Sequence, residues 1–409
     1  MKILHTADWH LGKRLERFSR LEEQREVLEE ICGIAEQEAV DAVIIAGDIY
    51  DTFNPASEAV ELFYKTVKRL ADEGRRAVVA IAGNHDSPDR FAAPEPLARE
   101  CGIVLSGYPH SVIEPFALKK GIAVTRADAG FLELKLPAAK APLRLLLTPY
   151  ANEKRLKTCL GFEDSEEEMR ALLQAHWQRL AKKYCNKKGV NLLAAHLFMI
   201  RKGQQPPEEP EDEKPILHVG GAQAVYSENL PKQIQYAALG HLHRKHLVSS
   251  KPCPVLYSSS PLAYSMSEAD QDKYVIIVEA EPGQPAAYRE VPLKSGKRLL
   301  RERFETVDAA VAWLEAHPRS LVELTLATDD FLTAEERRRL YSAHEGIVAI
   351  IPVVKSAPDA TGESRREINL DQSMEVLFRD YFRYRHQDQE PPEDLMALFR
   401  EILSAEEKE

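Results

Sequence analysis

Side chains that can bind metal ions follow short apolar runs at five places in the first 243 residues. The stretch AVVAIAGNHDSPDR, at 77–90, shows the pattern most fully, because an apolar run ends in glycine and an amide, an imidazole and a carboxylate follow in a row. Carboxylate, amide and imidazole donors together suit Mn²⁺, Fe²⁺ or Zn²⁺ better than the all-oxygen sites of Mg²⁺ or Ca²⁺. The candidate ligands are Asp8, His10, Asp48, Asn84, His196, His241 and His243.

The size of this ligand set indicates two ions rather than one. Seven ligands exceed the four of a tetrahedral ion, and they suit a pair of metals that share a bridging carboxylate. Such pairs, about 3.5–4 Å apart, serve many phosphoester hydrolases. A single histidine after a strand is usually an ordinary polar residue with satisfied hydrogen bonds, but five such groups in one chain are hard to obtain by chance. We therefore predict a centre for two divalent ions, with Mn²⁺ as the expected metal.

The elements that would position these side chains alternate between strands and helices. The five apolar runs are short, rich in Val, Ile and Leu, and bounded by glycine or polar residues, as buried strands are. Amphipathic helical patterns at 19–39 and 57–74 separate the first three runs. This alternation predicts a layered α/β domain, in which polar ligands gather beyond the carboxyl ends of the strands. The runs lie at 2–7, 42–47, 77–83, 190–195 and 235–240.

Composition narrows the possible function classes. The chain has 409 residues and a formal net charge of −11, which argues against a nucleic-acid coat over the whole surface but not against a local basic groove. The five cysteines show neither zinc-site nor C-x-x-C spacing, so we expect reduced thiols. No apolar run approaches membrane-spanning length, and we expect a soluble intracellular protein without a membrane partner.

The chain is predicted to have three parts. Residues 1–280 contain all the candidate ligands. Residues 287–355 show a βαβαβ pattern that predicts a small α/β cap domain. Residues 368–409 carry two amphipathic helical patterns beyond a polar linker. Because a short helical pair outside a domain has little to pack against, its apolar stripes favour binding to a partner.

The motifs D-x-H, G-D, G-N-H-D, a single His and G-H-x-H, in this order, resemble those of the calcineurin-like metallophosphoesterase superfamily. The resemblance implies a β-sandwich flanked by helices, to which the cap and the C-terminal helical pair are added. Two stretches, ILHTADWHLG and GDIYDTFNP, are more specific than these motifs. They resemble the bacterial counterparts of the eukaryotic nuclease of double-strand-break repair. Ser259 departs from the family pattern, because relatives usually have glycine there. A side chain disfavours positive φ, so we expect a different local loop.

The resemblance also implies a role for each site residue. Asp8, His10, Asp48 and His243 would hold one metal, and Asp48, Asn84, His196 and His241 the other, with Asp48 bridging. His85 would not bind a metal; it would stabilise charge on the scissile phosphate and help protonate the leaving oxygen. Asp86 would orient His85 as a hydrogen-bond acceptor.

Three functions follow from these expectations. The favoured one is a metal-dependent DNA nuclease subunit, with double-strand exonuclease and single-strand or hairpin endonuclease activity, which hydrolyses phosphodiesters with a water activated by two metals. It would serve DNA repair, recombination and replication in the bacterial cytoplasm, at the nucleoid. The alternative is a stand-alone metallophosphodiesterase acting on nucleotides or small phosphodiesters. A non-catalytic scaffold is the third, and the complete ligand set argues against it.

The resemblance implies several partners. We expect a homodimer that joins two copies of an SMC-like ATPase in a heterotetramer. The basic candidates for phosphate contacts with DNA are Lys13, Arg14, Arg17 and Arg20. The apolar candidates for the ATPase contact are Leu377, Phe378, Tyr381, Leu398, Phe399 and Ile402.

Overall fold

The computed structural model describes residues 1–150, 166–204, 225–328, 332–354 and 374–385, together with Pro391, Glu393, Leu395, Met396 and Phe399. The chain divides into two compact units, Met1–Val353 and Val354–Glu409, and each is described by itself. None of the helices in these described parts is long and apolar enough to cross a membrane.

The first sheet of the larger unit has six strands. Their order is β18 (Ala287–Pro292), β17 (Tyr274–Glu279), β1 (Lys2–Thr6), β4 (Ala42–Ala46), β5 (Ala77–Ile81) and β6 (Ile103–Ser106). Strands β1, β4, β5 and β6 run parallel to one another. Strand β17 runs antiparallel to β1, and β18 runs antiparallel to β17. Strands β4 and β5 are buried throughout and almost wholly apolar, as expected where both faces of a parallel sheet are covered.

The second sheet has eight strands. Their order is β15 (His246–Ser249), β16 (Val255–Tyr257), β14 (Tyr236–Gly240), β11 (Val190–His196), β10 (Leu143–Thr148), β9 (Phe131–Lys135), β8 (Ala123–Asp128) and β7 (Phe116–Ala117). The four strands β16, β14, β11 and β10 are parallel to one another, and antiparallel strands flank them. Both sheets therefore contain four adjacent parallel strands whose carboxyl ends can supply ligands.

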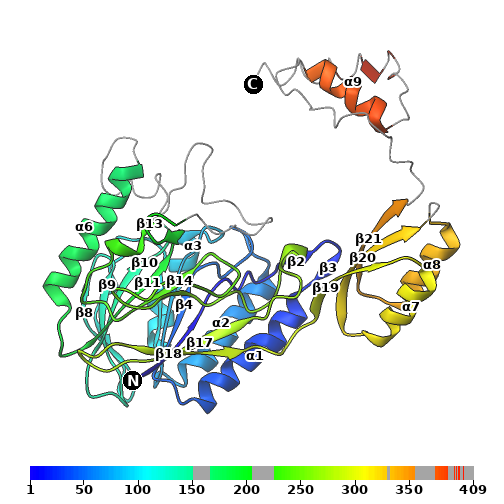
Figure 1. The fold of residues 1–409 in the computed structure, drawn as a ribbon. Coiled ribbons are helices and arrows are strands. Elements are labelled where there is room, and N and C mark those ends of the chain that lie inside the picture. The colour runs from blue at the N-terminus through cyan, green and yellow to red at the C-terminus, as the bar shows by residue number, and fades with distance from the viewer. Residues whose placement is uncertain are drawn as a thin grey trace. The chain divides into compact units, whose positions relative to one another are not determined.

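The two sheets pack face to face over one apolar core, to which Ile44 and Val79 of the first sheet and Leu145 and Leu192 of the second contribute. Helices α1 (Leu21–Gln37) and α2 (Ser57–Ala71) pack on the outer face of the first sheet. Helix α6 (Glu166–Tyr184) packs on the outer face of the second. Figure 1 shows α6 on one side of the strands and α1 and α2 on the other. The predicted layered α/β sandwich with flanking helices is confirmed.

Short elements connect these layers. They are β2 (Arg14–Leu15), β3 (Phe18–Ser19), α3 (Pro88–Ala92), α4 (Glu95–Ala98), η1 (Arg99–Cys101), β12 (Met199–Ile200), β13 (Val225–Tyr226), η2 (Ser227–Asn229) and η3 (Met266–Glu268). Two of them matter for the site. The β2–β3 hairpin follows the Asp8/His10 motif, and η3 lies in the loop between the second sheet and β17.

The cap has the predicted βαβαβ order. Its sheet is β19 (Arg298–Phe304), β20 (Ser320–Thr328) and β21 (Ile347–Val354), and its helices are α7 (Val307–Ala316) and α8 (Ala334–Ala343). The expected start of the cap at residue 287 is wrong, because β18 pairs along its whole length with β17 of the first sheet. The added strand lengthens the sandwich sheet, and the cap begins at β19.

The second unit contains α9 (Met374–Arg385), which confirms the first of the two helices expected in the tail. The ring of Phe378 stacks on that of Phe399, with centroids 4.1 Å apart. Two of the apolar residues expected to bind a partner therefore contact each other. Leu398, Ile402 and the side chain of Tyr381 lie outside the described residues.

Ser259 keeps the backbone conformation that glycine favours. Its φ is 87°, so the expectation that a side chain would exclude positive φ here is wrong. The hydroxyl oxygen of Ser259 accepts a hydrogen bond from the Tyr274 N–H at 2.9 Å, and this bond links the loop to the start of β17. The hydrogen bond offsets part of the backbone strain.

His5 joins the two sheets through the core. It lies on β1, and its ring bonds the hydroxyl of Tyr236 at 2.9 Å and the carbonyl oxygen of Leu239 at 3.1 Å, both on β14. Because a carbonyl only accepts, Nε2 carries the hydrogen and Nδ1 accepts from the tyrosine. Burial lowers the pKa of His5 to about 3, against a smaller rise from the Leu239 carbonyl. The folded protein therefore holds His5 neutral.

We expect His5 to make the protein sensitive to acid. The pKa of His5 is lower in the folded protein than in the unfolded chain. Below about pH 6.5, His5 is therefore protonated in the unfolded chain but stays neutral in the folded protein. Stability contributed by His5 is thus lost as the pH falls from 6.5 toward 3, by about 1.4 kcal/mol per pH unit. Urea unfolding of the wild type and of His5→Leu between pH 6 and 4 measures this. Equal slopes for the two proteins would contradict it.

Candidate metal centre

The seven candidate ligands meet at one edge of the sandwich. Each lies at or just beyond the carboxyl end of a parallel strand, from β1, β4 and β5 in the first sheet and from β11 and β14 in the second. All seven are buried, and the most exposed, Asn84, has 7% of its surface accessible. Because both sheets end here, residues 188 positions apart (Asp8 and His196) lie only 3.8 Å apart, measured from Oδ1 to Nδ1.

One subset of ligands surrounds His196. Its Nε2 lies 2.7 Å from Oδ1 of Asn84 and 3.2 Å from Oδ2 of Asp48. Ligand atoms of Asp48, His196 and His241 all lie within 4.8 Å of one another, close enough to hold one ion. The Nδ1 of His196 lies 2.9 Å from the Ala46 carbonyl oxygen and donates to it, which leaves Nε2 as the nitrogen for a metal.

The other subset surrounds His10. The Nε2 atoms of His10 and His243 are 2.9 Å apart, and Nε2 of His10 lies 3.7 Å from Oδ2 of Asp48. Asp8 is tied to the same edge, since its Oδ1 accepts a hydrogen bond from the His241 N–H at 2.8 Å. The Oδ2 atom of Asp48 is thus near both subsets, as a bridging carboxylate must be.

The backbone is unusual at four of these ligands. Asp8, His10, Asp48 and His241 have φ values of 56°, 43°, 47° and 112°. Such left-handed conformations cost roughly 1–3 kcal/mol each for residues with a side chain and concentrate at functional sites. Hydrogen bonds between the two loops support them, from the Asp8 N–H to the Gly47 carbonyl and from the His10 N–H to the Asp48 carbonyl, each 3.0 Å long.

Two glycines make room for the ligands. A Cβ on Gly47, whose φ is 95°, would lie 2.1 Å from Nδ1 of His196. A Cβ on Gly83 would lie 2.0 Å from Oδ1 of Asp48. Neither distance is possible between unbonded atoms, so no larger residue fits at either position without moving a candidate ligand.

The electrostatics of the cluster favour bound cations. Burial raises the pKa of Asp8 to about 7, although His196 and His243 oppose the rise. Burial would lower the pKa of His196, but the charges of Asp48 and Asp8 outweigh it and raise the pKa to about 9. Asp8 Oδ2 is buried and has no hydrogen-bond partner among the described residues. Buried carboxylates and imidazoles with an orphaned oxygen fit divalent cations, which would compensate the negative charge.

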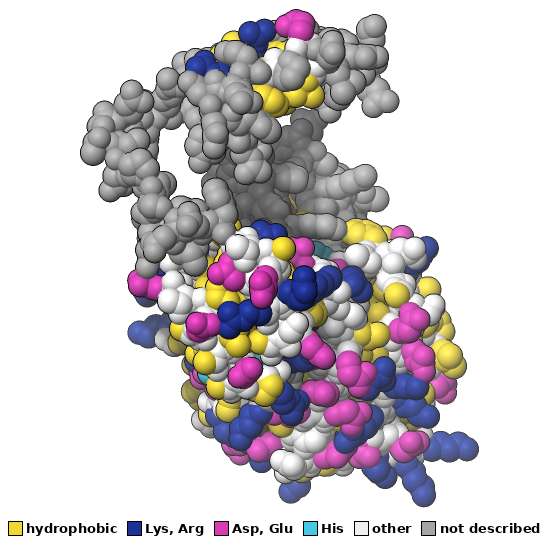
Figure 2. Space-filling model, turned by 90° about the vertical axis from the view of Figure 1, so that its right-hand side faces the viewer, with side chains coloured by type: hydrophobic (Ala, Val, Ile, Leu, Met, Phe, Trp, Pro, Cys, Tyr) yellow, Lys and Arg dark blue, Asp and Glu magenta, His cyan; other side chains and the backbone are white. Residues whose placement is uncertain are grey.

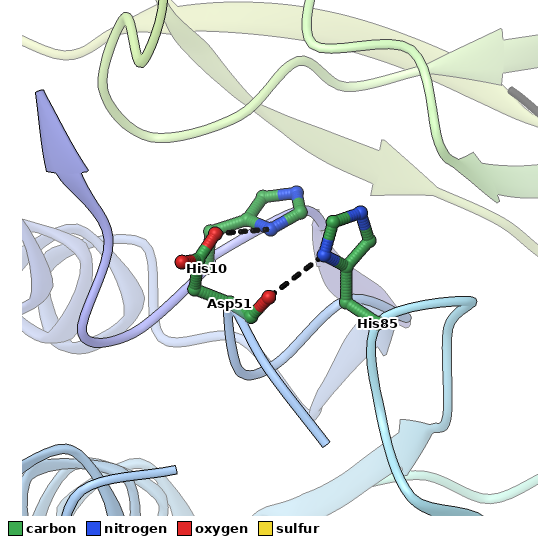
Figure 3. A group of neighbouring side chains, drawn as sticks. All are labelled: His10, Asp51 and His85. Carbon is green, nitrogen blue, oxygen red and sulfur yellow. Dashed lines mark hydrogen bonds and ion pairs between the residues drawn. The ribbon is translucent and has the colours of Figure 1, made fainter. Parts of the chain in front are cut away.

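His85 lies beside these ligands, and ligand atoms of His10, Asp51 and His85 all lie within 4.8 Å of one another, close enough to hold an ion. The Nδ1 of His85 lies 2.8 Å from the backbone carbonyl oxygen of Asp51, and its ring meets that of His10 edge-on, with centroids 4.8 Å apart (Figure 3). The carboxylate of Asp51 lies 3.9 Å from Nδ1 of His10 and 3.2 Å from Nζ of Lys13. Asp51 escaped the sequence analysis, although its place three residues after Asp48 in GDIYD was a usable signal.

Asp86 is held by the backbone of two loops. Its carboxylate accepts three backbone hydrogen bonds, from the N–H groups of Ile49 at 3.0 Å, Tyr50 at 2.9 Å and Gly83 at 2.8 Å. The Asp51 carbonyl is the acceptor at Nδ1 of His85, and the orienting role expected of Asp86 stays a prediction. Asp86 therefore holds the loop that follows β5 against the loop that follows β4.

Similarity to known proteins identifies the family of this chain. Residues 1–245 match the family model of the calcineurin-like phosphoesterases. The SbcD subunit of the nuclease SbcCD from Bacillus subtilis (strain 168) is 36% identical over 100% of this chain and 99% of its own length. The chain belongs to the SbcD group of the calcineurin-like phosphoesterase family.

Other SbcD proteins support the same membership. The SbcD protein of Rhodobacter capsulatus is 32% identical over 74% of this chain and 71% of its own length. That of Escherichia coli (strain K12) is 25% identical over 98% of each chain. As a member of this family the chain is a metal-dependent phosphoesterase, a hydrolase, and the family resemblance inferred from the motifs is confirmed.

The basic residues predicted to contact DNA have different surroundings. Arg20 is fully buried and pairs with Glu23 at 2.8 Å, so its predicted role in DNA contact is wrong. Arg17 donates to the Ile347 carbonyl oxygen of the cap at 3.2 Å, and Arg14 is exposed and donates to the Arg17 carbonyl. On the face shown in Figure 2, Lys and Arg are interspersed with Asp and Glu.

We expect Gly83→Ala to weaken metal binding at the centre. The added methyl group would displace Asp48, the carboxylate near both subsets, so Mn²⁺ binding should fall at both sites, by more than about tenfold. Isothermal titration of the metal-free protein measures this. Gly33→Ala is the matched control, because a Cβ there meets nothing within 4 Å. In the interior of α1 it should stabilise the fold by about 0.5–1 kcal/mol. Wild-type Mn²⁺ affinity in Gly83→Ala would refute the clash.

Proposed function

We propose that this chain is the nuclease component of an SbcCD-type complex and hydrolyses phosphodiester bonds of DNA with two divalent ions, Mn²⁺ being the best suited. The observation that carries the proposal is the buried convergence of seven ligand-type side chains around Asp48, with His85 beside them. The similarity to the SbcD protein of the Bacillus subtilis nuclease SbcCD along the whole chain supports DNA as the substrate.

The two ions would be held by the two subsets. Asp8, His10, Asp48 and His243 would hold one, and Asp48, Asn84, His196 and His241 the other. When bound, the ions supply a water that loses its proton near neutral pH and neutralise charge on the phosphoryl oxygens. The chain's own part is to hold the ligands at fixed positions in a dry site, which the short contacts around His196 and His10 support.

His85 would serve the leaving group. The Asp51 carbonyl accepts from Nδ1, so Nδ1 carries a hydrogen, and Nε2 is the nitrogen that can deliver a proton when the ring is charged. The alkoxide that leaves a phosphodiester is a strong base, and a positioned acid lowers the barrier to its departure by stabilising it as an alcohol. Asp86 would act indirectly, since it fixes the loop that carries His85.

The proposal includes partners. The exposed Arg14 and Arg17 and the partly exposed Lys13 remain candidates for phosphate contacts. The apolar residues of the second unit, Leu377 and Phe378 on α9 among them, are candidates for binding an SbcC-like ATPase. A homodimer of this chain with two ATPase subunits, acting as a double-strand exonuclease and a single-strand or hairpin endonuclease, is the finer form of the proposal.

We expect His85→Ala to keep both metals and to lose about 10²–10⁴-fold in Mn²⁺-dependent cleavage of linear and hairpin DNA, because only the acid is removed. Cleavage assays and Mn²⁺ titration of the same sample measure the two effects. His110→Ala, a change at an exposed histidine, is the control. Loss of metal binding in His85→Ala would contradict its role. Hydrolysis of bis-p-nitrophenyl phosphate with no DNA cleavage, even with the ATPase present, would favour a stand-alone phosphodiesterase.

We expect deletion of 368–409 to abolish co-purification with an SbcC-like ATPase. Residues Met1–Val353 form a compact unit of their own, so the shortened chain should fold and keep hydrolysing bis-p-nitrophenyl phosphate. Pull-down of tagged ATPase and the small-substrate assay measure the two properties. An unchanged yield of complex would place the ATPase contact elsewhere.

A further inference from the structure

A buried carboxylate outside the ligand set contacts one of the candidate ligands. Glu268 ends η3, in the loop between β16 and β17, and only 3% of its surface is accessible. Its Oε1 lies 3.2 Å from Nδ1 of His243. The same oxygen accepts hydrogen bonds from the N–H groups of Tyr264 at 3.1 Å and Ser265 at 3.2 Å, so the carboxylate is fixed from several sides.

A buried lysine balances the charge of Glu268. The ammonium of Lys273 donates to Oε2 of Glu268, to the carbonyl oxygen of His243 at 2.7 Å and to Oγ of Ser260 at 3.0 Å. These three bonds match the three hydrogens that an ammonium can donate. The buried ion pair with the ammonium of Lys273 is the observation that identifies Glu268 as a carboxylate where it contacts His243.

The contact with Glu268 fixes one side of the His243 ring. A carboxylate accepts only, so Nδ1 of His243 carries the hydrogen, and Nε2 is left for a metal. That Nε2 lies 2.9 Å from Nε2 of His10, the other histidine of the same subset. A carboxylate behind a ligating histidine fixes the ring and makes it a stronger donor. At His196 a backbone carbonyl does the same, whereas at His243 a side chain does it and can be changed by mutation.

The loop that carries Glu268 is itself held by the cap. Met266, two residues before Glu268, packs in a cluster with Leu15, Leu299 and Leu321. Leu299 and Leu321 belong to cap strands β19 and β20. The N–H of Asp270 donates to the carbonyl oxygen of Leu299 at 3.2 Å. The position of Glu268 is therefore determined by contacts on both sides of its loop.

We infer that Glu268, with its charge balanced by Lys273, is a positioning residue that fixes the tautomer and orientation of His243 as a metal ligand. The inference rests on the proposed two-metal centre. It adds to that centre a group that contacts no metal itself, and it predicts that one of the two metals depends on Glu268.

Titration of the metal-free, full-length protein with Mn²⁺ tests the inference without an activity assay. In Glu268→Gln the affinity of one Mn²⁺ should fall about 10–100-fold, and that of the other should stay within about threefold. The double variant Glu268→Gln/Lys273→Met removes both charges together, which avoids an unpaired buried ammonium. It should show the same selective loss with a melting temperature near that of the wild type.

The tautomer gives a second readout. In ¹⁵N-histidine-labelled, metal-free protein the His243 signals should show the Nδ1–H form in the wild type and a larger share of the Nε2–H form in the double variant. Asp272→Asn is the matched control, because this carboxylate lies in the same loop, is exposed and pairs with Arg298. It should leave both affinities unchanged.

The outcomes are distinguishable. Wild-type affinity for both ions in the folded double variant would overturn the role of Glu268 and leave the metal centre intact. Equal weakening of both ions would overturn it too, since a general loss of structure would explain that result. A wild-type chain that binds no Mn²⁺ would overturn the metal centre and this inference with it.

Discussion

The candidate metal centre depends on where the parallel strands end and on how the backbone turns there. In each sheet the strands that carry candidate ligands stop at the same edge, and the backbone turns at once through left-handed conformations at Asp8, His10, Asp48 and His241. Each such residue costs roughly 1–3 kcal/mol. Hydrogen bonds between neighbouring loops and the packing of two sheets over one core hold these conformations in place. Without the sandwich behind it, this edge would relax.

The same edge concentrates charge away from water. Buried carboxylates and imidazoles are costly unless they are paired or bind a cation. The raised pKa of Asp8 expresses this cost, whereas the raised pKa of His196 reflects the negative charges of Asp48 and Asp8 beside it. Divalent ions that bind the folded chain and not the unfolded one would offset it and stabilise the protein. At this candidate metal centre, stability and metal binding would thus be linked.

Two carboxylates outside the set of candidate ligands, Asp86 and Glu268, hold parts of the site in position. Asp86 joins the loops that follow β4 and β5 through three backbone hydrogen bonds. Glu268 reaches His243 from a loop that also packs against the cap. The cap is therefore in contact with the structure that positions the candidate ligands, in addition to forming an apolar core of its own around α7 and α8.

The sequence by itself determined many of the helices and strands, and the order of the candidate ligands along the chain. Short apolar runs, amphipathic periods and the motifs from Asp8 to His243 are local signals, so the five strands that end in candidate ligands, α1, α2, the βαβαβ cap and the set of candidate ligands could be predicted. Tertiary structure alone decided the rest. The pairing of β18 with β17, the burial of Arg20, the backbone partners of Asp86, the Asp51 carbonyl behind His85 and the Glu268–His243 contact all depend on what the folded chain brings alongside. A hydrogen-bonding group takes the nearest partner in space, and sequence distance does not reveal which partner that is.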